Sequence, residues 1–486
     1  MSDYVVVYHF FNYFSTIAFN IFGSYNIFVM NKLKIILSVA VCKLSRNLIR
    51  LMGRGGTDMP GRLALKICPD LLKYLAKDVT TLIVTGTNGK TTSSRMLEQC
   101  LINNGCSYIA NKSGANLLSG ITAEFAANAR LTGKMNCDYA LIEADEAAFK
   151  MVGLYTNPKY VLVTNVFRDQ LDRYGEITHT LNNIRIGLER SPEAVVCING
   201  DCSLSASLRD DIPNKVIFFG VNVPIYKEMV AEVSDAPYCI RCKTEYKYEY
   251  RTYGHLGGYY CPKCGYRRPE PSVAVTEIIS TDETSSKVVM NVAGKPLTVD
   301  INLPGGYNIY NAAGVMTIAT AAGFSPESAV SALSDFECGF GRMEKFEMNG
   351  SDVQMILIKN PAGCNQVLNF LANLDTPSAF TVCLNDNYAD GTDISWIWDV
   401  NFEGLLECDD MLTDIFISGK RADDMALRFK YAGFNTDKLH VIKDYDRLID
   451  AIEQQEHPCY IMPTYTAMLD LREKISKRYG LKDYWK

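Results

Sequence analysis

Residues 82–101, LIVTGTNGKTTSSRMLEQCL, decide the fold of this chain. A short β-branched run enters the stretch, Gly86 and Gly89 interrupt it, and a helical pattern from Thr91 to Leu101 leaves it. This order of strand, glycine-rich turn and helix suits a phosphate-binding loop, because backbone N–H groups and the helix N-terminus then point at an anion. The alternative is an ordinary turn with a surface lysine. We favour the phosphate loop, whose expected binding residues are Gly86, Thr87, Asn88, Gly89, Lys90, Thr91 and Thr92.

Two side chains of this loop have a specific expected chemistry. Lys90 supplies a movable positive charge, and the Thr91 hydroxyl is expected to face a phosphate-bound Mg²⁺. The loop departs from the usual pattern in one respect. A glycine normally stands five residues before Gly89, and this chain has Val84 there.

Composition limits the classes of protein that remain possible. A length of 486 residues predicts two to four domains, and 48% hydrophobic with 21% charged residues is typical of a globular chain. The net charge of −6 provides no overall field that attracts nucleic acid. Sixteen cysteines are scattered along the chain, which favours a reducing, cytoplasmic compartment over a secreted disulfide scaffold.

The N-terminal region is unusually apolar. No charged residue occurs between Asp3 and Lys32, and the run is long enough to span a bilayer. Polar residues interrupt it, however, and it has neither a basic start nor a cleavage site. We favour an over-extended reading frame, with Met30 as the true start, over a membrane anchor. Residues 33–52 are expected to form an amphipathic helix that either packs on the next domain or rests on a membrane surface.

From about Leu63 to Ser325, short apolar strands alternate with helical stretches, which predicts a parallel sheet with helices on both faces. The expected strands are residues 80–85, 139–143, 160–165, 194–199 and 215–220. Glu143 ends the second of them, and Asp145 and Glu146 follow. Because Mg²⁺ prefers carboxylate oxygen, we expect Glu143 to bind it together with Thr91; the other two acids have helix capping as an alternative role.

Four cysteines form a metal-binding pattern. Cys239 and Cys242 are separated by eighteen residues from Cys261 and Cys264, with a Tyr- and Gly-rich stretch between the two pairs. This spacing predicts a zinc ribbon, with four thiolates around a tetrahedral Zn²⁺. Basic residues in the ribbon would allow nucleic-acid binding, but we favour a structural role for a segment too small to have a core of its own.

A helix is expected to begin after Pro304. Asn308 and Asn311 are three residues apart in it, so both amides lie on one face near the first turn. The alternative is plain helix capping by Asn308.

The short Gly-Thr-x-Gly-Lys-Thr-Thr loop resembles that of the Mur ligase and folylpolyglutamate synthase superfamily. Enzymes of this superfamily use ATP to activate a carboxylate as an acyl phosphate, which an amine then attacks. The resemblance implies that the loop binds ATP and that Asn308 and Asn311 lie on its adenine side. It also implies that Arg342, in a Gly-Arg-x-Glu sequence between two domains, reaches a phosphate or the ribose.

The chain also departs from that superfamily. Residues 164–175 resemble a Mur ligase segment, but Gln170 and Tyr174 stand where the ligases have histidines, which argues against metal binding by this segment. No lysine occurs between Arg173 and Lys215, so the carbamylated lysine of several Mur ligases is expected to be missing. A His-Asn-Pro sequence of the ligases is matched with Lys359 in place of the histidine.

A second α/β block follows residue 345. Its expected strands are residues 355–358, 380–384, 414–418, 439–442 and 459–462, and its expected helices include residues 422–431 and 466–477. Residues 384–399, LNDNYADGTDISWIWD, leave one of these strands and contain four aspartates and two of the three tryptophans. By pattern alone they form an exposed loop.

This loop, the ribbon and the RGGTDMPG sequence at 54–61 resemble the MurT subunits of lipid II isoglutaminyl synthase, over about residues 40–479. The resemblance implies an N-terminal extension with a lead helix (1–53), a Mur-ligase-like ATP-binding domain (54–343) with the ribbon inserted at about 235–268, and a Rossmann-like α/β domain (344–486) that contacts a partner. It implies ATP, Mg²⁺ and Zn²⁺ as the bound groups.

The activity that the resemblance implies is ATP-dependent amidation of the α-carboxyl of D-glutamate in the lipid II stem peptide, giving D-isoglutamine. A class I glutamine amidotransferase partner of the GatD type would supply ammonia, and Asp393 would complete the partner's catalytic triad. None of the five histidines lies in a recognisable Cys/His nucleophile motif. The expected location is cytoplasmic, with peripheral association at the inner membrane face left open.

Two other functions stay open on the sequence. The first is a stand-alone folylpolyglutamate or amino-acid ligase, which would use an amino acid rather than ammonia and need no partner. The second is a zinc-ribbon ATPase that binds nucleic acid, which the acidic net charge disfavours.

Overall fold

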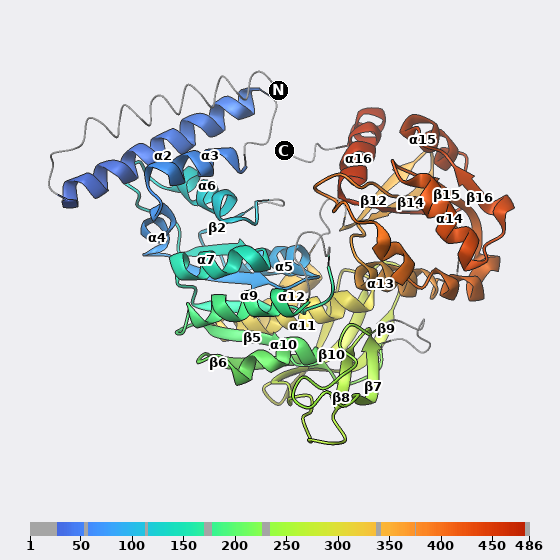
Figure 1. Cartoon of the computed structure of the whole chain (residues 1–486), viewed down its shortest axis with the longest axis horizontal. Coiled ribbons are helices and arrows are strands. Elements are labelled where there is room, and N and C mark those ends of the chain that lie inside the picture. The colour runs from blue at the N-terminus through green and yellow to red at the C-terminus, as the bar shows by residue number, and fades with distance from the viewer. Residues whose placement is uncertain are drawn as a thin grey trace.

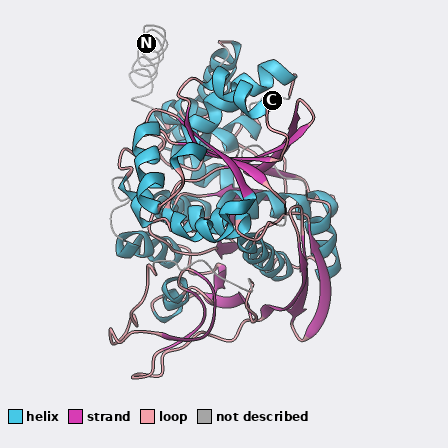
Figure 2. Cartoon of the chain, turned by 90° about the vertical axis from the view of Figure 1, so that its right-hand side faces the viewer, coloured by secondary structure: helices cyan, strands magenta, loops and turns pink. Residues whose placement is uncertain are grey.

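The computed structural model describes residues 27–52, 57–111, 115–169, 177–225, 234–336, 342–374 and 376–481. Four segments named above lie outside this part: the apolar run before residue 27, the start of RGGTDMPG, residues 170–175, and residues 339–341 before Arg342. The side chain of Arg342 is also outside it. The described residues form a nine-stranded sheet, a six-stranded sheet and a two-stranded hairpin, with helices around the two larger sheets (Figures 1 and 2).

The nine-stranded sheet forms the core of the first domain. In sheet order its strands are β11 (Lys295–Ile301), β10 (Ser286–Val292), β9 (Val273–Thr281), β6 (Lys215–Val221), β5 (Val195–Asn199), β4 (Tyr160–Val163), β1 (Thr80–Thr85), β3 (Tyr139–Glu143) and β2 (Tyr108–Ala110). β1 is parallel to both of its neighbours, β3 and β4. The carboxyl ends of these three strands therefore meet at one edge of the sheet, which is where α/β sheets bind phosphate ligands.

All five strands predicted for this block are present, with shifts of one or two residues at three of them. These five strands are mutually parallel, as predicted, but the complete sheet is mixed. β9 pairs parallel with β6, but β10 and β11 extend the sheet as an antiparallel meander. Their alternating burial, with one face covered and one exposed, is typical of antiparallel strands.

Helices cover both faces of this sheet. α5 (Lys90–Asn103), α11 (Gly306–Ala321) and α12 (Pro326–Ser334) pack together on one face. The other group consists of α4 (Leu71–Ala76), α6 (Leu118–Asn128), α7 (Glu146–Thr156) and α9 (Ile177–Glu189). α11 is buried on nearly all sides, so its first turn is held rigidly against the carboxyl ends of the strands.

The predicted lead helix is present as α2 (Ile27–Leu51), which packs against α3 (Met59–Ile67) and α6. Ile35, Val39, Cys42 and Ile49 are buried in this contact, and Arg46 forms a 2.8 Å ion pair with Glu124 of α6. Packing on the next domain is thus confirmed. None of the helices in the described part of the chain is both long and apolar enough to cross a bilayer.

The second domain is built on the six-stranded sheet. Its strands, in order, are β12 (Arg342–Met348), β13 (Ser351–Ile356), β17 (Cys459–Pro463), β14 (Ser378–Cys383), β15 (Leu412–Ser418) and β16 (Leu439–Val441). All pairs are parallel except β12 with β13. Five of these strands are predicted by the sequence. β12 is not, because residues 342–344 belong to the Gly-Arg-x-Glu sequence expected between the domains and the charged residues that follow give no continuous apolar run. The helices are α13 (Pro361–Leu371), α14 (Ala422–Ala432), α15 (Tyr445–Glu453) and α16 (Tyr465–Tyr479).

The hairpin lies between β6 and β9, which are neighbours in the nine-stranded sheet, so it is an insertion in that domain. It consists of β7 (Lys247–Tyr253) and β8 (Leu256–Tyr260). In Figure 1 it lies at the lower end of the molecule, far from α2 at the upper edge. A small aromatic cluster that includes Tyr246, Tyr259 and Tyr266 forms its core.

Candidate active site

The predicted phosphate loop connects β1 to α5 at the carboxyl edge of the central sheet. Gly86 and Gly89 have φ values of 119° and 84°, which side-chain-bearing residues rarely adopt. A Cβ on Gly89 would lie 2.1 Å from Asn311 Oδ1, so this glycine also lets the loop approach α11. Asn88 N donates to Asn165 Oδ1 at 2.9 Å, which ties the loop to the segment after β4. The loop is therefore held from two sides.

Lys90 is buried inside this loop. Its Nζ donates to the carbonyl oxygens of Gly86 (2.5 Å) and Thr87 (3.2 Å) and forms a 3.1 Å ion pair with Glu146. Burial works to lower the pKa of Lys90, but the surrounding carboxylates, Glu146 foremost, outweigh it and raise that pKa above its usual value. Burial in turn raises the pKa of Glu146. Lys90 thus stays protonated, a fixed positive charge beneath the loop.

Thr91 and Glu143 make the pair that the sequence suggested for Mg²⁺. Thr91 Oγ1 donates to Glu143 Oε1 at 3.0 Å, and both side chains are buried. A hydroxyl and a carboxylate next to a phosphate loop are hard oxygen donors of the type Mg²⁺ prefers, so the donor set fits that ion. Asp145 instead caps α7 by accepting from Ala147 N at 3.0 Å, and Glu146 is paired with Lys90.

A cavity adjoins the phosphate loop at the contact between the two domains. Asn308 and Asn311 line it, and they are joined by a 3.0 Å bond from Asn311 Nδ2 to Asn308 Oδ1. Asn308 does not cap α11, whose N-cap is Gly305; its amide donates to Pro304 O at 2.7 Å. The second domain closes the cavity with apolar residues that include Met343, Ile356, Leu357 and Val367.

Two side chains of the second domain reach the loop. Lys359 Nζ lies 3.3 Å from Thr87 O and 2.6 Å from Asp169 Oδ2, and Asn360 Nδ2 donates to Asn88 Oδ1 at 3.1 Å. Burial works to raise the pKa of Asp169, but the Lys359 charge prevails and holds that pKa below its usual range. Lys359 and Asn360 thus connect the two domains directly at the phosphate loop.

A second, smaller pocket contains Asp393. It is lined by Asp393, Ser395, Trp396 and Asp399 from the predicted loop and by Arg168, Asp169, Lys359, Asn360 and Pro361 from the site above. Asp393 is exposed, and its Oδ1 accepts from Ser395 N at 2.8 Å. The other three aspartates of the loop have partners elsewhere: Asp386 pairs with Arg421, Asp390 bonds Thr466, and Asp399 pairs with Arg168. Lys359 borders both this pocket and the cavity at the phosphate loop.

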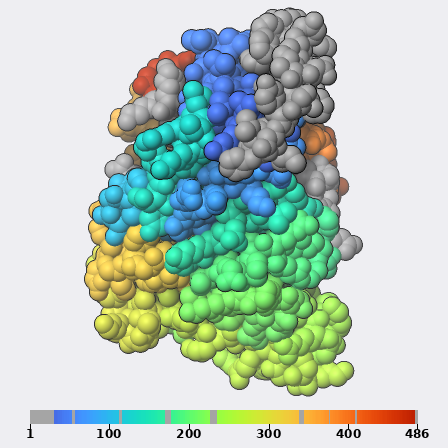
Figure 3. Space-filling model, turned by 90° about the vertical axis from the view of Figure 1, so that its left-hand side faces the viewer, coloured from blue at the N-terminus to red at the C-terminus, as the bar shows by residue number. Residues whose placement is uncertain are grey.

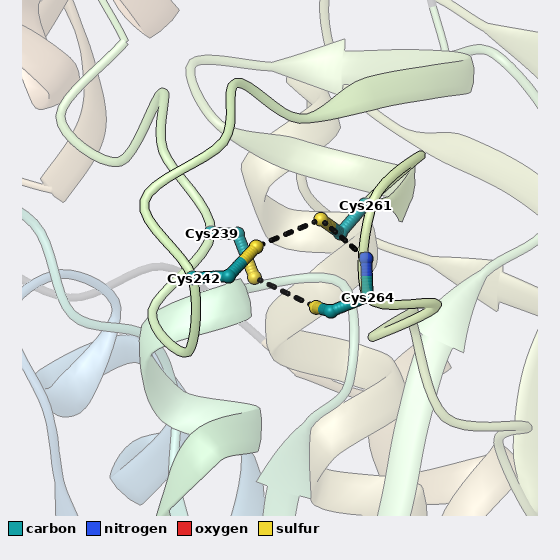
Figure 4. A group of neighbouring side chains, drawn as sticks. All are labelled: Cys239, Cys242, Cys261 and Cys264. Carbon is teal, nitrogen blue, oxygen red and sulfur yellow. Dashed lines mark hydrogen bonds between the residues drawn. The ribbon is translucent and has the colours of Figure 1, made fainter.

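The four cysteines of the ribbon converge, as predicted (Figure 4). All four sulfur atoms lie within 4.8 Å of one another, with Cys239 Sγ 3.6 Å from Cys264 Sγ and Cys242 Sγ 3.4 Å from Cys261 Sγ. Tetrahedral thiolates at about 2.3 Å from Zn²⁺ would be about 3.8 Å apart, so the spacing fits that ion.

Each pair of cysteines lies in the same type of turn. Cys239 N donates to Thr244 O and Cys261 N to Tyr266 O, both at 2.7 Å. The residue after the second cysteine has positive φ in both, 60° at Lys243 and 73° at Gly265.

The hairpin reaches from these cysteines to the cavity. Tyr253, at the end of β7, lines the cavity and stacks on Phe167 with ring centroids 5.8 Å apart. Phe167 N donates to Thr87 Oγ1 in the phosphate loop at 3.1 Å. At the hairpin's base, Arg268 Nε and Tyr310 OH bond the buried Asp201 at 2.5 and 2.6 Å. The ribbon therefore supports one wall of the cavity.

The structure brings together one Cys/His pair that the sequence did not predict. Cys202 Sγ lies 3.2 Å from His255 Nε2, and both residues are fully buried. Burial lowers the pKa of His255 to about 3 and raises the pKa of the Cys202 thiol. The pair therefore stays neutral and inaccessible, unlike a nucleophilic cysteine, which needs an exposed thiolate.

Comparison with known proteins identifies the family. The Mur ligase middle domain family matches residues 84–255, and the MurT ligase C-terminal family matches residues 357–468. The subunit MurT of lipid II isoglutaminyl synthase (glutamine-hydrolyzing) from Streptococcus pneumoniae is 34% identical over 92% of this chain and 98% of its own length. This chain belongs to the MurT family.

A second MurT relative, from Staphylococcus aureus, is 28% identical over 91% of this chain and 98% of its own. Among solved structures, a pseudomurein peptide ligase type C from Methanothermus fervidus superposes with a TM-score of 0.65 at 18% identity, covering 85% of this chain and 81% of that one. At that identity the likeness concerns the fold alone.

Sequence reasoning missed several residues of this MurT family site. Tyr253 lines the cavity but stands in no motif, and Tyr307 lines it from an unspecified position just before Asn308. Glu146, for which helix capping was an alternative role, is the partner of Lys90. Lys359 was noticed only as a departure from the ligases. Its position at a strand end, before Asn-Pro, was the one available signal. Arg342 remains a prediction, since its side chain is outside the described part.

Proposed function

We propose that this chain is the ATP-consuming subunit of a lipid II isoglutaminyl synthase. It amidates the α-carboxyl of D-glutamate in the lipid II stem peptide to D-isoglutamine, with ammonia from a GatD-type class I glutamine amidotransferase bound as a heterodimer. One observation carries the proposal. Lys359 borders both the cavity at the phosphate loop and the pocket of Asp393, so a nucleotide site and an exposed carboxylate for a partner's histidine adjoin each other.

The ATP side of the reaction follows from the residues around the loop. A carboxylate is a poor acyl donor, and it becomes reactive when its oxygen attacks the γ-phosphorus of ATP and ADP leaves. The loop N–H groups and Lys90 stabilise the charge on the transferred phosphoryl group. Thr91 and Glu143 would hold Mg²⁺, which neutralises phosphate charge when bound. Asn308 and Asn311 would bind the adenine side, and Arg342 a phosphate or the ribose.

Ammonia then completes the reaction. Its lone pair attacks the acyl carbon, the C–N bond forms, the C–O bond to phosphate breaks, and inorganic phosphate leaves with the nitrogen losing a proton. A buried Cys202–His255 pair cannot generate that ammonia from glutamine, because both groups are neutral and closed to solvent. We therefore assign the supply of nitrogen to a second protein.

The partner side is supported by exposed aromatic residues of the loop that contains Asp393 and of α14, which contacts this loop. Tyr388, Trp398 and Tyr431 are 81%, 50% and 72% exposed, and Trp398 and Tyr431 form an edge-to-face pair at 5.8 Å. Exposed aromatic residues are enriched at protein–protein interfaces. We infer that the partner docks here and that Asp393 orients its catalytic histidine, stabilising the imidazolium that forms.

The ribbon is assigned a structural Zn²⁺ site at Cys239, Cys242, Cys261 and Cys264. Its basic residues are partly neutralised by neighbours, with Arg241 paired to Asp210 and Arg267 to Glu249. This argues against a nucleic-acid surface and for a support of the cavity wall.

The experiment that tests this function separates the nitrogen sources. The chain alone, given ATP, lipid II and ammonium chloride, should form the amide slowly; adding the partner should make glutamine an efficient source, as followed by mass spectrometry. Ligation of a free amino acid to the acceptor without any partner would instead support the folylpolyglutamate-type alternative and overturn the proposal.

A further inference from the structure

The lead helix α2 has a second apolar face whose side chains are exposed. Leu33, Ile36, Leu44, Leu48 and Leu51 are all exposed, Leu44 by 63% and Leu51 by 85%. At 100° per residue these side chains share one side of the helix, opposite the buried line of Ile35, Val39, Cys42 and Ile49. We call these five exposed residues the α2 stripe.

Basic residues accompany the α2 stripe. The helix contains Lys32, Lys34, Lys43, Arg46 and Arg50 and no acidic residue. By the helical period, Lys32, Lys43 and Arg50 lie on one flank of the stripe and Lys34 on the other, while Arg46 faces Glu124 of α6. The whole chain carries a net charge of −6, so this helix is a local positive surface on an acidic protein.

We propose that the α2 stripe docks on the surface of a lipid bilayer with anionic headgroups. A helix with leucines and isoleucine on one side and lysines beside them lies in the plane of such a membrane, its apolar face in the acyl boundary and its cations at the headgroups. Because the opposite side of α2 is fixed to α3 and α6, the helix stays parallel to the surface and does not insert across it.

The position of α2 agrees with this role. It lies at the upper edge of the first domain, and the ribbon lies at the opposite, lower end (Figure 1). Figure 3 shows α2 at one extremity of the surface, away from the hairpin. If the proposed function holds, docking through α2 brings the chain to the membrane that carries its lipid-linked substrate; the docking itself does not depend on that function.

The test is flotation of the full-length chain with vesicles that contain no lipid II. We expect binding to vesicles of phosphatidylglycerol and phosphatidylcholine, weakening with added salt, and little binding to phosphatidylcholine alone. The double variant Leu44→Glu, Leu48→Glu should reduce the bound fraction at least tenfold. The control variant is Leu131→Glu, Leu154→Glu, which changes two leucines outside α2 that are 55% and 45% exposed. It should bind the vesicles as the wild type does.

A second measurement keeps the test independent of variant folding. In the variant Leu44→Trp, brominated phosphatidylglycerol should quench the fluorescence of the introduced tryptophan. In the control Leu131→Trp it should leave that fluorescence unchanged. Unaltered binding of the Leu44→Glu, Leu48→Glu variant would overturn the proposal and assign membrane contact to residues 1–26. Equal binding of the wild type to neutral and anionic vesicles would also overturn the proposal. So would the finding that the wild type is a dimer and that the Leu44→Glu, Leu48→Glu variant is a monomer.

The two proposals can fail separately. The Leu44→Glu, Leu48→Glu variant should still amidate lipid II dissolved in detergent, because α2 lines neither pocket of the candidate site. Loss of amidation by the wild type in detergent would contradict the proposed function and leave the vesicle result standing.

Discussion

At the scale of single residues, the account depends first on Lys90. This lysine is held under the phosphate loop by two carbonyl oxygens and Glu146, and Lys359 reaches the same loop from the second domain. We expect Lys90→Ala to reduce ATP-dependent amidation by about 10²- to 10³-fold, as removal of a preorganised charge-stabilising group does. The exposed Lys73→Ala is the matched control. Retained amidation in Lys90→Ala, measured with ammonium as the nitrogen source, would refute the site.

Asp393 has a different predicted phenotype. The variant Asp393→Asn keeps an acceptor for Ser395 N but loses the charge that would stabilise the partner's imidazolium. We expect glutamine-dependent amidation to fall by about 10³- to 10⁴-fold, as loss of a triad carboxylate does, whereas ammonium-dependent amidation and partner binding stay near wild type. The control is Asp423→Asn, an exposed aspartate on α14 of the same domain. Failure of ammonium to restore amidation in Asp393→Asn would show that the assigned role is wrong.

His255 should make stability depend on pH. Burial lowers its pKa to about 3, whereas an unfolded histidine has a pKa of about 6.5. Below pH 6.5 the unfolded chain therefore binds a proton that the folded chain excludes, and stability is lost as the pH falls. Between pH 7.5 and 5.5, burial of this neutral histidine lowers the free energy of unfolding by about 1.4 kcal/mol.

The variant His255→Gln should lack that contribution. The difference in free energy of unfolding between pH 7.5 and 5.5, measured by denaturant titration, should shrink by about 1.4 kcal/mol relative to the wild type. His457, which is only partly buried, provides the control in His457→Gln. An unchanged pH dependence in His255→Gln would mean that the imidazole is not buried as neutral.

Site residues could be predicted from the sequence only where the backbone conformation requires a particular residue type. The glycines of the phosphate loop need positive φ, and the following Lys90 and Thr91 are fixed by the start of α5, so their positions could be predicted from the pattern. Lys359 and Tyr253 could not, because each reaches the site from a segment distant in sequence. Only tertiary packing brings them there.

At the scale of elements, the ribbon has a measurable link to the nucleotide cavity. Tyr253 lies in the cavity wall and stacks on Phe167, which is bonded to the phosphate loop. Tyr253→Ala should weaken ATP binding about fivefold, equivalent to about 1 kcal/mol of ring contact. Chelating the Zn²⁺ that we propose for the ribbon, or introducing Cys239→Ser and Cys264→Ser together, should weaken ATP binding to a similar extent and lower the midpoint of thermal unfolding.

Calorimetric titration with ATP measures this effect without relying on turnover. The matched control is Tyr74→Ala, an exposed tyrosine on α4. If neither Tyr253→Ala nor metal chelation changed the affinity for ATP, the ribbon would not support the cavity wall and this role would be wrong.

The elements themselves were largely predictable. Strands such as β1 and β3, buried on both faces between glycines and helices, were predicted with their observed bounds. The meander β9–β11 and strand β12 were not, because alternating and charged sequences there give no continuous apolar run. The helical period predicts that α2 is amphipathic. Only the structure shows which of its apolar side chains are buried against α3 and α6 and which stay exposed.

At the scale of the whole molecule, the site exists only where the two domains meet. Lys359 and Asn360 contact the phosphate loop from the second domain, and Arg168 pairs across to Asp399 at 2.9 Å. The sequence predicted two α/β units but not how they face each other, since that arrangement depends on a few contacts between distant residues. These contacts set the Asp393 pocket beside the cavity, which is the arrangement that two coupled reactions need.

The most direct measurement of this central claim follows one nitrogen atom. The chain, its amidotransferase partner, ATP, lipid II and glutamine labelled with ¹⁵N in the side-chain amide are combined, and the stem peptide is analysed by mass spectrometry. The account predicts a ¹⁵N amide at the α-carboxyl of D-glutamate only when both proteins and ATP are present. Labelled amide formed by this chain without its partner, or formed without ATP, would contradict it.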